Sequence, residues 1–229
     1  MRSIKWLVAL GLCVVMMVGC GSKPEGDSGG GKAAKGKKQF VIAFSQCNSA
    51  EPYRTAQNNI MKREIAKYPD CELLIQDAQQ DNAKQIAQIE NFILQNVNVL
   101  IVAPNEAAPI TAPVKKAKEK GIQVVCLERN LVEPVYDIFV GADNVAIGEM
   151  AGQFVASYVQ EKGIEDPIIV ELKGLLGTKP QEERHDGARK YIDAIPNVKV
   201  IVDVADWIQN EALKQIGRAS CRERVYHPV

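Results

Sequence analysis

The stretch GIQVVCLERN, residues 121–130, decides the fold that we predict for this chain. Residues 122–127 are almost all β-branched or aliphatic, and the charged pair Glu128 and Arg129 follows them at once. A strand that is apolar along its whole length is buried on both faces, which is typical of a parallel sheet covered by helices on each side. We therefore expect a buried parallel strand that ends in two charged side chains at the rim of a core.

The same pattern recurs upstream of this stretch. Short apolar runs occupy residues 40–44, 73–75 and 99–103, and the segments between them carry apolar residues at spacings of three and four. Those helix-spaced positions are Ile86, Ile89, Ile93, Ile110, Val114 and Ala117. The alternation of buried strands with amphipathic helices predicts a doubly wound α/β lobe over residues 39–140.

A second round of the same rhythm follows a break near residues 135–143. It predicts a helix at 144–160, a strand at 168–172, a helix at 182–194 and a strand at 198–204, and hence a second doubly wound parallel-sheet lobe over residues 141–215. No strand is followed by GxGxxG or by GxxxxGK with Ser or Thr, and GLLGTKP at residues 174–180 lacks that ending. No nucleotide or other cofactor is therefore expected.

The first twenty residues carry an export pattern. Arg2 and Lys5 precede one apolar run over residues 6–18, which is short for a bilayer span and typical of a signal peptide. The run ends in MVGC, which resembles the lipobox of bacterial lipoproteins and implies that Cys20 is acylated; the alternative is a plain secretory peptide. Residues 21–38 are rich in Gly, Lys and Ser, so we expect a flexible tether between a membrane anchor and an extracytoplasmic domain.

The other end of the chain breaks the apolar periodicity. Residues 216–229, IGRASCRERVYHPV, place Cys221 among three arginines, and IGRASCRERV resembles the translation of a sequencing-adapter read-through. On that interpretation the natural sequence stops near Gln215 and the second lobe is incomplete. The alternative is a genuine basic C-terminus.

Charge and cysteine content exclude other classes. Lys plus Arg and Asp plus Glu each number 28, so no net positive charge draws the chain to nucleic acid. Cys47, Cys71 and Cys126 lie in or beside apolar runs without CxxC or Cys/His spacing, so we expect small buried side chains and no metal site, while one disulfide among them stays open.

Polar turns follow the predicted strands. Ligands of open parallel sheets bind outside the carboxyl ends of the strands, so these turns are the candidate site. Their sequences are SQCNSAEPYR at residues 45–54, APNEAAP at 103–109, LERN at 127–130, ADN at 142–144, KGLLGTKPQEER at 173–184 and ADW at 205–207.

These turns, together with DAQQDNAKQIAQIENFI at residues 77–93, form an ordered set that resembles the type I periplasmic sugar-binding proteins of ABC importers, the family of ribose-, galactose- and galactofuranose-binding proteins. The resemblance spans residues 39–215 and implies a two-lobed monomer that binds a sugar in an interlobe cleft and delivers it to an ABC permease in the membrane. It also implies that the chain is not an enzyme. The residues that it places in the cleft are Ser45, Gln46, Tyr53, Arg54, Glu128, Arg129, Asp143, Arg184 and Trp207.

The chemistry of these residue types suits a sugar. Carboxylates accept from neighbouring hydroxyls, an arginine fork donates to two oxygens, and an aromatic ring covers a C–H face. We expect Glu128 and Arg129 to be unpaired in the empty cleft. The alternatives are a rim ion-pair network for these two, an exposed helix position for Arg184, a core aromatic for Trp207 and a helix N-cap for Asp143.

Three other functions compete with transport. A sensory module that signals to a histidine kinase or chemoreceptor shares the lobe pair, and so does the effector domain of a sugar-responsive repressor. An extracytoplasmic enzyme is disfavoured because Glu182 and Glu183 are adjacent and diverge on a helix, and because His185 points away from Arg184 toward the surface.

Overall fold

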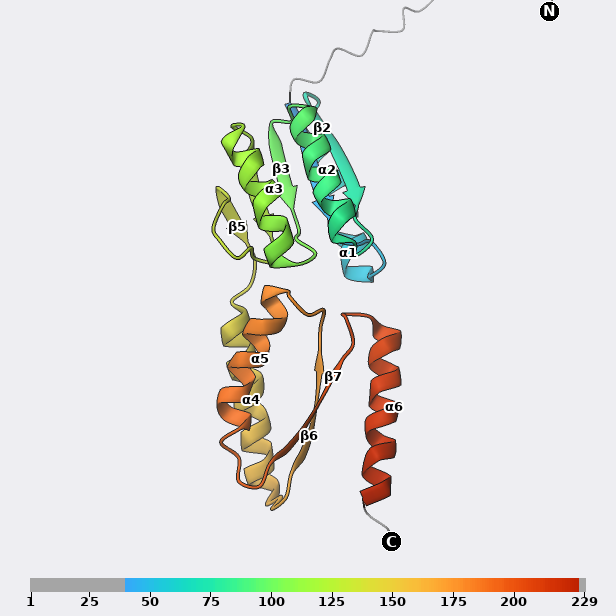
Figure 1. The fold of residues 1–229 in the computed structure, drawn as a ribbon, viewed down its shortest axis with the longest axis vertical. Coiled ribbons are helices and arrows are strands. Elements are labelled where there is room, and N and C mark those ends of the chain that lie inside the picture. Colours follow the sequence, from blue (N-terminus) through green and yellow to red (C-terminus); the bar gives the residue numbers. More distant parts are fainter. Residues whose placement is uncertain (1–39, 227–229) are drawn as a thin grey trace, which may run out of the picture. The chain divides into compact units, whose positions relative to one another are not determined.

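The computed structural model describes residues 40–226, with side chains through residue 218. The predicted signal peptide, Cys20 and the tether lie outside these residues. Helices and strands alternate along the chain (Figure 1). In chain order they are β1 Phe40–Gln46, α1 Pro52–Ile65, β2 Cys71–Asp77, α2 Asn82–Leu94, β3 Val99–Val102, α3 Ala107–Glu119, β4 Gln123–Leu127, β5 Ile138–Val140, α4 Asn144–Lys162, β6 Ile168–Lys173, α5 Lys179–Ile192, β7 Lys199–Val204 and α6 Gln209–Tyr226.

The first sheet has five strands in the order β2-β1-β3-β4-β5, and all of its neighbours are parallel. Phe44 of β1 pairs with Ile75 of β2 on one side and with Ile101 of β3 on the other. The apolar runs at residues 40–44, 73–75, 99–103 and 122–127 lie in four of these strands, which confirms the predicted parallel α/β fold.

The fifth strand, β5, lies inside the segment that we predicted as a break. Ile138 pairs with Val125 and Val140 with Leu127, so the chain adds a short edge strand before it enters α4. Asp137 fixes its start, because the carboxylate accepts a 2.7 Å hydrogen bond from the backbone N–H of Val124 and pairs with Lys118. The hydrogen bond from Lys118 holds the pKa of Asp137 below its ordinary value. The sequence pattern therefore did not predict β5, although the chain does leave the first sheet within the predicted segment, between Val140 and Asn144.

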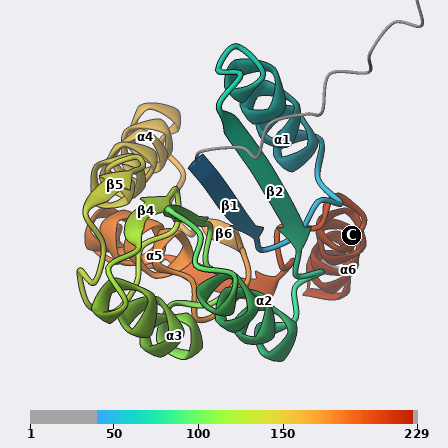
Figure 2. The ribbon, with the colours of Figure 1, turned by 90° about the horizontal axis from the view of Figure 1, so that it is seen from above.

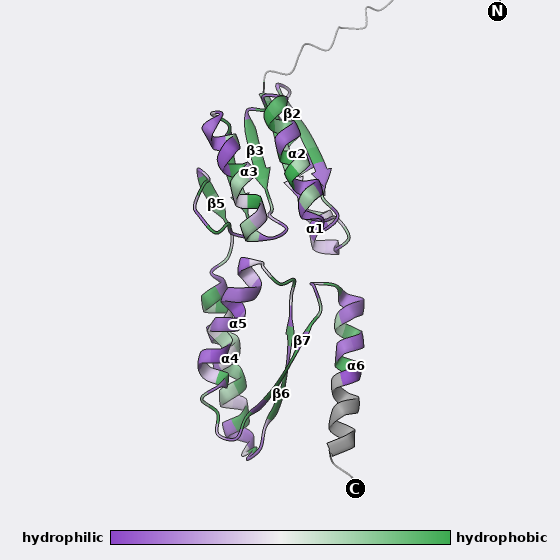
Figure 3. Cartoon of the chain, viewed as in Figure 1, coloured by the Kyte–Doolittle hydropathy of each residue, from purple (hydrophilic) through white to green (hydrophobic). Residues whose placement is uncertain are grey.

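Helices cover both faces of the first sheet. α1 lies on one face, and α2 and α3 lie side by side on the other (Figure 2). Figure 3 shows β3 hydrophobic along its length, as expected for a strand between two helical layers. The core between the first sheet and the helices α2 and α3 is enclosed. Its side chains that are inaccessible to solvent include Ile89, Phe92, Leu100, Ile110 and Val124.

The second sheet consists of β6 and β7, which are parallel and in register from Ile168 opposite Lys199 to Lys173 opposite Val204. α4 and α5 pack together on one side of it and α6 lies on the other (Figure 1). The predicted helix at 182–194 begins earlier, at Lys179, because Thr178 is its N-cap and Pro180 fits the first turn. The predicted helix at 144–160 continues to Lys162 and ends at Gly163, whose φ of 62° closes it.

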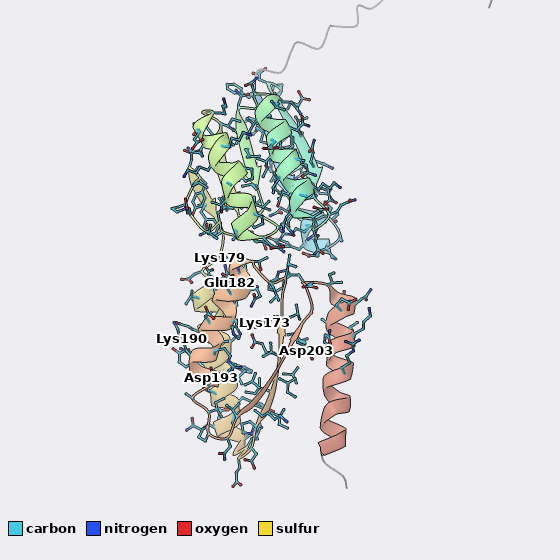
Figure 4. All side chains as sticks on the ribbon, viewed as in Figure 1. Lys173, Lys179, Glu182, Lys190, Asp193 and Asp203 are labelled. Carbon is cyan, nitrogen blue, oxygen red and sulfur yellow. The ribbon has the colours of Figure 1, made fainter. Side chains whose placement is uncertain are left out.

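α4 and α5 approach each other through glycines. A Cβ on Gly152 would lie 2.5 Å from the carbonyl oxygen of Ala188, and one on Gly148 would overlap the backbone of Arg184. From the α5 side, a Cβ on Gly187 would lie 2.6 Å from the carbonyl oxygen of Val145. Lys190, labelled in Figure 4, adds an ion pair from α5 to Glu149 on α4 at 2.7 Å. The two helices therefore form one closely packed pair.

α6 begins at Gln209 and includes residues of the tail that we predicted as non-native from residue 216. Within the described part of the chain, no helix combines the length and apolar character needed to cross a membrane. Cys47, Cys71 and Cys126 are all free, so the disulfide left open by the sequence is not formed among them.

Candidate functional site

A pocket of about 200 Å³ lies at the carboxyl ends of strands from both sheets. It gathers five charged side chains, and a proline and two aromatic side chains complete its wall. Its lining residues are Glu51, Tyr53, Arg54, Glu128, Arg129, Pro180, Arg184 and Trp207. Six of the predicted site residues are thus brought together here, and Glu51 and Pro180 were missed.

A larger hollow of about 870 Å³ lies elsewhere, beside the last turns of α4 and α5. Its wall is mostly apolar, with Val159, Ile164 and Ile195 among its residues, and Glu165 is the one charged side chain that lines it. We place the candidate site in the smaller pocket, because convergent charged groups at strand ends mark ligand sites in parallel sheets.

Arg54 is the centre of the pocket's charge network. It lies in the first turn of α1, its side chain is 1% exposed, and its guanidinium pairs with Glu128. The same guanidinium lies 3.7 Å from a carboxylate oxygen of Glu51 and donates to Oε1 of Gln46 at 3.4 Å. The prediction that Glu128 is unpaired was therefore wrong: Arg54 reaches from α1 to the end of β4, and Glu128 gives this buried cation an opposite charge.

Glu128 has an unusual backbone conformation directly after β4. Its φ is 65°, in the left-handed region that a side chain with a Cβ seldom adopts, while its N–H donates to the carbonyl of Val140 at 2.6 Å. This turn ends the strand pairing and places Glu128 and Arg129 in the pocket wall. Strain of this kind gathers at functional sites.

Arg129 is 2% exposed and carries a charge that is only partly satisfied. Its Nη1 donates to the backbone carbonyl of Asn105 at 3.1 Å. Among the side chains of residues 40–218, no carboxylate lies within ion-pair distance of it. A buried guanidinium with few acceptors is ready to donate to a ligand oxygen.

Two buried thiols lie near this wall. Burial raises the pKa of Cys47, an effect that the neighbouring charges of Arg129 and Arg54 partly offset. Burial raises the pKa of the Cys126 thiol to about 12. Both thiols are neutral at physiological pH. Cys47 and Cys126 are buried as predicted, while Cys71 is only partly buried.

The second sheet contributes Arg184 and Trp207. Arg184 donates from Nε to Oδ1 of Asn144 at 2.9 Å, and its guanidinium carbon lies 5.7 Å from the ring centroid of Trp207. The ring packs directly on Gly174, where a Cβ would collide with it. Both residues are half-buried, so Arg184 is not a fully exposed helix residue and Trp207 is not a core aromatic. The indole N–H has no hydrogen-bond partner and is a free donor.

Three predicted residues do not line the pocket. Ser45 is fully buried and its hydroxyl donates to Gln88, while the amide of Gln46 donates to Gln57 and Asn58, so both side chains are held within the first α/β layer. Asp143 is exposed and caps α4 by accepting from the N–H of Ala146 at 3.0 Å, which is the alternative that the sequence left open.

His185 was expected at the surface and not in the cleft. It does not line the pocket, but neither is it a freely exposed side chain. The residue is half-buried, and its Nδ1 lies 2.6 Å from Oε1 of Glu171 on β6. Adjacent residues point in different directions around a helix, so His185 faces the sheet while Arg184 faces the pocket. His185 is therefore a contact between helix and strand.

Comparison with known proteins places this geometry in a family. The sequence model of the family described as periplasmic binding protein domain matches residues 42–219, more than half of the chain. The chain belongs to this family. The matched segment contains both sheets, apart from the first two residues of β1, and all eight residues that line the pocket.

Named relatives share this domain. The chain is 31% identical over 157 residues to the ribose import binding protein of Bacillus subtilis (strain 168), covering 69% of this chain and 50% of the relative. It is also 31% identical over 165 residues to the galactofuranose-binding protein of Escherichia coli (strain K12), covering 71% and 51%. The relatives are binding proteins and not enzymes, in agreement with the sequence-based expectation.

A solved structure shows the same fold. The fructose-binding periplasmic domain of a hybrid two-component system, BT1754, is 34% identical with a TM-score of 0.72, covering 80% of this chain and 60% of that domain. The chain spans about half the length of the curated relatives it matches.

Proposed function

We propose that this protein is an extracytoplasmic binding protein that captures a monosaccharide-like ligand in the pocket around Arg54 and Glu128 and delivers it to an ABC permease. The observation that carries the proposal is the convergence of five charged side chains and two aromatic rings in a pocket of about 200 Å³ at the carboxyl ends of both sheets. That volume is below the roughly 300 Å³ at which drug-sized pockets begin, so the ligand is small.

The wall of the pocket offers what a sugar needs. Arg129 and Arg184 have N–H groups to donate, Glu51 and Glu128 have oxygens to accept, and the indole N–H of Trp207 is free. A sugar hydroxyl both donates and accepts, so it can join these groups in one network. An analogue that lacks a hydroxyl leaves a buried charged group without its partner, which gives selectivity.

Binding is coupled to closure in this proposal. The pocket takes residues from α1 and the β4 end on one side and from α5 and the β7 end on the other. A ligand that touches both sides stabilises the closed arrangement by its differential affinity, and the permease then recognises that arrangement. No covalent bond changes. Export and acylation at Cys20 belong to the same proposal, since export brings the protein across the membrane and the acyl chains hold it at the outer face.

A sensory role is the second candidate. It is supported by the similarity to a periplasmic domain that is part of a hybrid two-component system. In that role the closed arrangement signals to a membrane histidine kinase or chemoreceptor. Neighbouring permease and ATPase genes support transport, and a neighbouring kinase gene supports sensing.

The test is calorimetric titration of the chain with D-ribose, D-galactose, D-fructose and L-arabinose. We expect one of them to bind and Arg129→Ala to weaken that binding by about 10- to 150-fold, the effect of losing a hydrogen bond from a charged donor. Arg63→Ala, which removes a guanidinium from the exposed part of α1, is the control and should bind as before. Unchanged affinity in Arg129→Ala removes this residue from the site, and no heat with any sugar contradicts the sugar assignment.

A further inference from the structure

A backbone hydrogen bond joins the two sides of the pocket away from its charged residues. The N–H of Ala107, the first residue of α3, donates to the carbonyl oxygen of Gly177 at 3.0 Å. Gly177 lies in the turn between β6 and α5, so this bond connects a helix of the first sheet with a loop of the second. Ala107 is buried.

This bond caps α3. The N-cap residue Glu106 is extended, with φ −128° and ψ 150°, and its side chain makes no capping hydrogen bond. The first N–H groups of a helix have no partner within the helix, and an acceptor placed there also complements the positive end of the helix dipole. The carbonyl of Gly177 supplies the cap that Glu106 does not.

Glycine is favoured in the turn that presents this carbonyl. Gly177 has a φ of 75°, and a Cβ on it would lie 3.2 Å from Oε2 and 3.4 Å from Cγ of Glu106. Glu106 is restrained in turn, because Nδ2 of Asn82 donates to its Oε1 at 2.7 Å. The next residue, Thr178, is 1% exposed and its hydroxyl donates to the carbonyl of Leu175 at 2.7 Å, which fixes the turn.

The contact is connected to the pocket through Asn105. The carbonyl of Asn105 accepts from Arg129, and its Nδ2 donates to Oδ1 of Asn82, the residue that holds Glu106. On the other side, the helix that begins after Gly177 carries Arg184 into the pocket wall. The contact therefore joins the two segments that position Arg129 and Arg184.

We propose that the hydrogen bond between Ala107 and Gly177 is a latch: it stabilises the closed arrangement and raises sugar affinity without touching the sugar. The inference rests on the proposed function, because the affinity that it modulates is that of the sugar site. Closed-state contacts of this kind shift the balance between open and closed forms, and the ligand's apparent affinity follows the closed population.

Two variants remove the latch by different routes. Ala107→Pro deletes the donor at the first helical position, which proline favours, and the extended backbone of Glu106 suits a residue before proline. The chain itself uses proline in the first turns of α1 and α5. Gly177→Ala keeps the donor but strains the turn and presses on Glu106.

Gly163→Ala is the matched control. Gly163 has a φ of 62°, so alanine there meets the same backbone strain, but nothing lies within 4 Å of its Cβ position. Sugar affinity is measured by calorimetry with the sugars named above, and protection of the Ala107 amide is measured by hydrogen exchange, which needs no ligand. We expect both latch variants to weaken binding by about 2- to 12-fold, the net value of one hydrogen bond, while Gly163→Ala binds normally.

The two readouts separate the latch from the proposed function. Loss of Ala107 protection in Gly177→Ala, but not in Gly163→Ala, supports the contact whether or not a sugar binds. Failure of all the sugars to bind counts against the proposed sugar site and leaves the contact itself unaffected. The latch is overturned if the Ala107 amide of the unmodified chain exchanges freely with and without sugar. It is equally overturned if the latch variants bind as tightly as Gly163→Ala.

Discussion

The two sheets of this protein are built from the same β-α-β unit but are stabilised in different ways. In the first, five strands carry helices on both faces and enclose a core in which side chains such as Leu100 and Phe92 are inaccessible. In the second, two strands lie between the α4–α5 pair and α6, and apolar side chains of α4 are exposed, Phe154 to 71% and Met150 to 63%. The first sheet is held by a buried interior, and the second depends on the contact between α4 and α5.

This difference shows what a parallel sheet needs. Each added strand gives the covering helices more apolar surface to bury, at about 25 cal/mol per Å². With two described strands, the helices of the second sheet bury much of their surface against each other, which is why glycines occur at their contact. The stability of that region therefore depends more on close contact between the backbones of α4 and α5 than on the volume of buried side chains.

The largest effect is expected in the first sheet. Leu100→Ala opens a cavity in the enclosed core of β3 and should lower the free energy of unfolding by about 2–5 kcal/mol. Urea denaturation measures the loss, and hydrogen exchange should show it in β1, β3 and β4. Leu94→Ala on the exposed side of α2 is the control, with an expected change within about 0.5 kcal/mol. Equal losses in both variants would contradict an enclosed core.

An intermediate effect is expected at the helix pair. Gly148→Ala places a methyl group on the backbone of Arg184, so α4 and α5 must separate, and we expect a loss of about 1–3 kcal/mol confined to the second sheet and its helices. Gly217→Ala on α6 has nothing within 4 Å of its Cβ position and should be neutral or stabilising. If Gly148→Ala unfolds like Gly217→Ala, the helix pair is not what holds this region.

The smallest effect is expected on the exposed face of α4. Phe154→Ser replaces a ring that is mostly in solvent, so the free energy of unfolding should change by no more than about 0.5 kcal/mol. Phe92→Ser in the core of the first sheet is the contrast and should be strongly destabilising. A large loss of stability in Phe154→Ser would show that α4 has a buried partner, and the contrast between the two regions would have to be withdrawn.

Much of the fold could be predicted from the sequence because buried parallel strands are continuous apolar runs. β1, β3 and β4 follow this rule, while β2, β6 and β7 carry shorter apolar runs and are only partly buried. β5 was missed because it has only three residues, and its pairing depends on Asp137, whose role appears only when β4 lies beside it.

The site could be predicted only as far as the turns that form it. The strand-end rule gives the turns, but not the direction of each side chain within them. Ser45 and Gln46 at the end of β1 are engaged by the amide side chains of Gln88 on α2 and Asn58 on α1, and these contacts form only once both helices pack on the sheet. The pairing of Glu128 with Arg54 depends on the orientation of α1, a helix whose apolar pattern is too weak to indicate its buried face.

The environment of Arg54 has a consequence for the entropy of binding. Its guanidinium is already fixed by Glu51 and Glu128 from two elements, and its side chain is 1% exposed. An arginine that is free in solution loses about 2 kcal/mol of rotamer entropy when it is immobilised. Here that entropy is lost during folding. A ligand that binds Arg54 therefore meets a donor that is already ordered, and binding loses no further side-chain entropy at this residue.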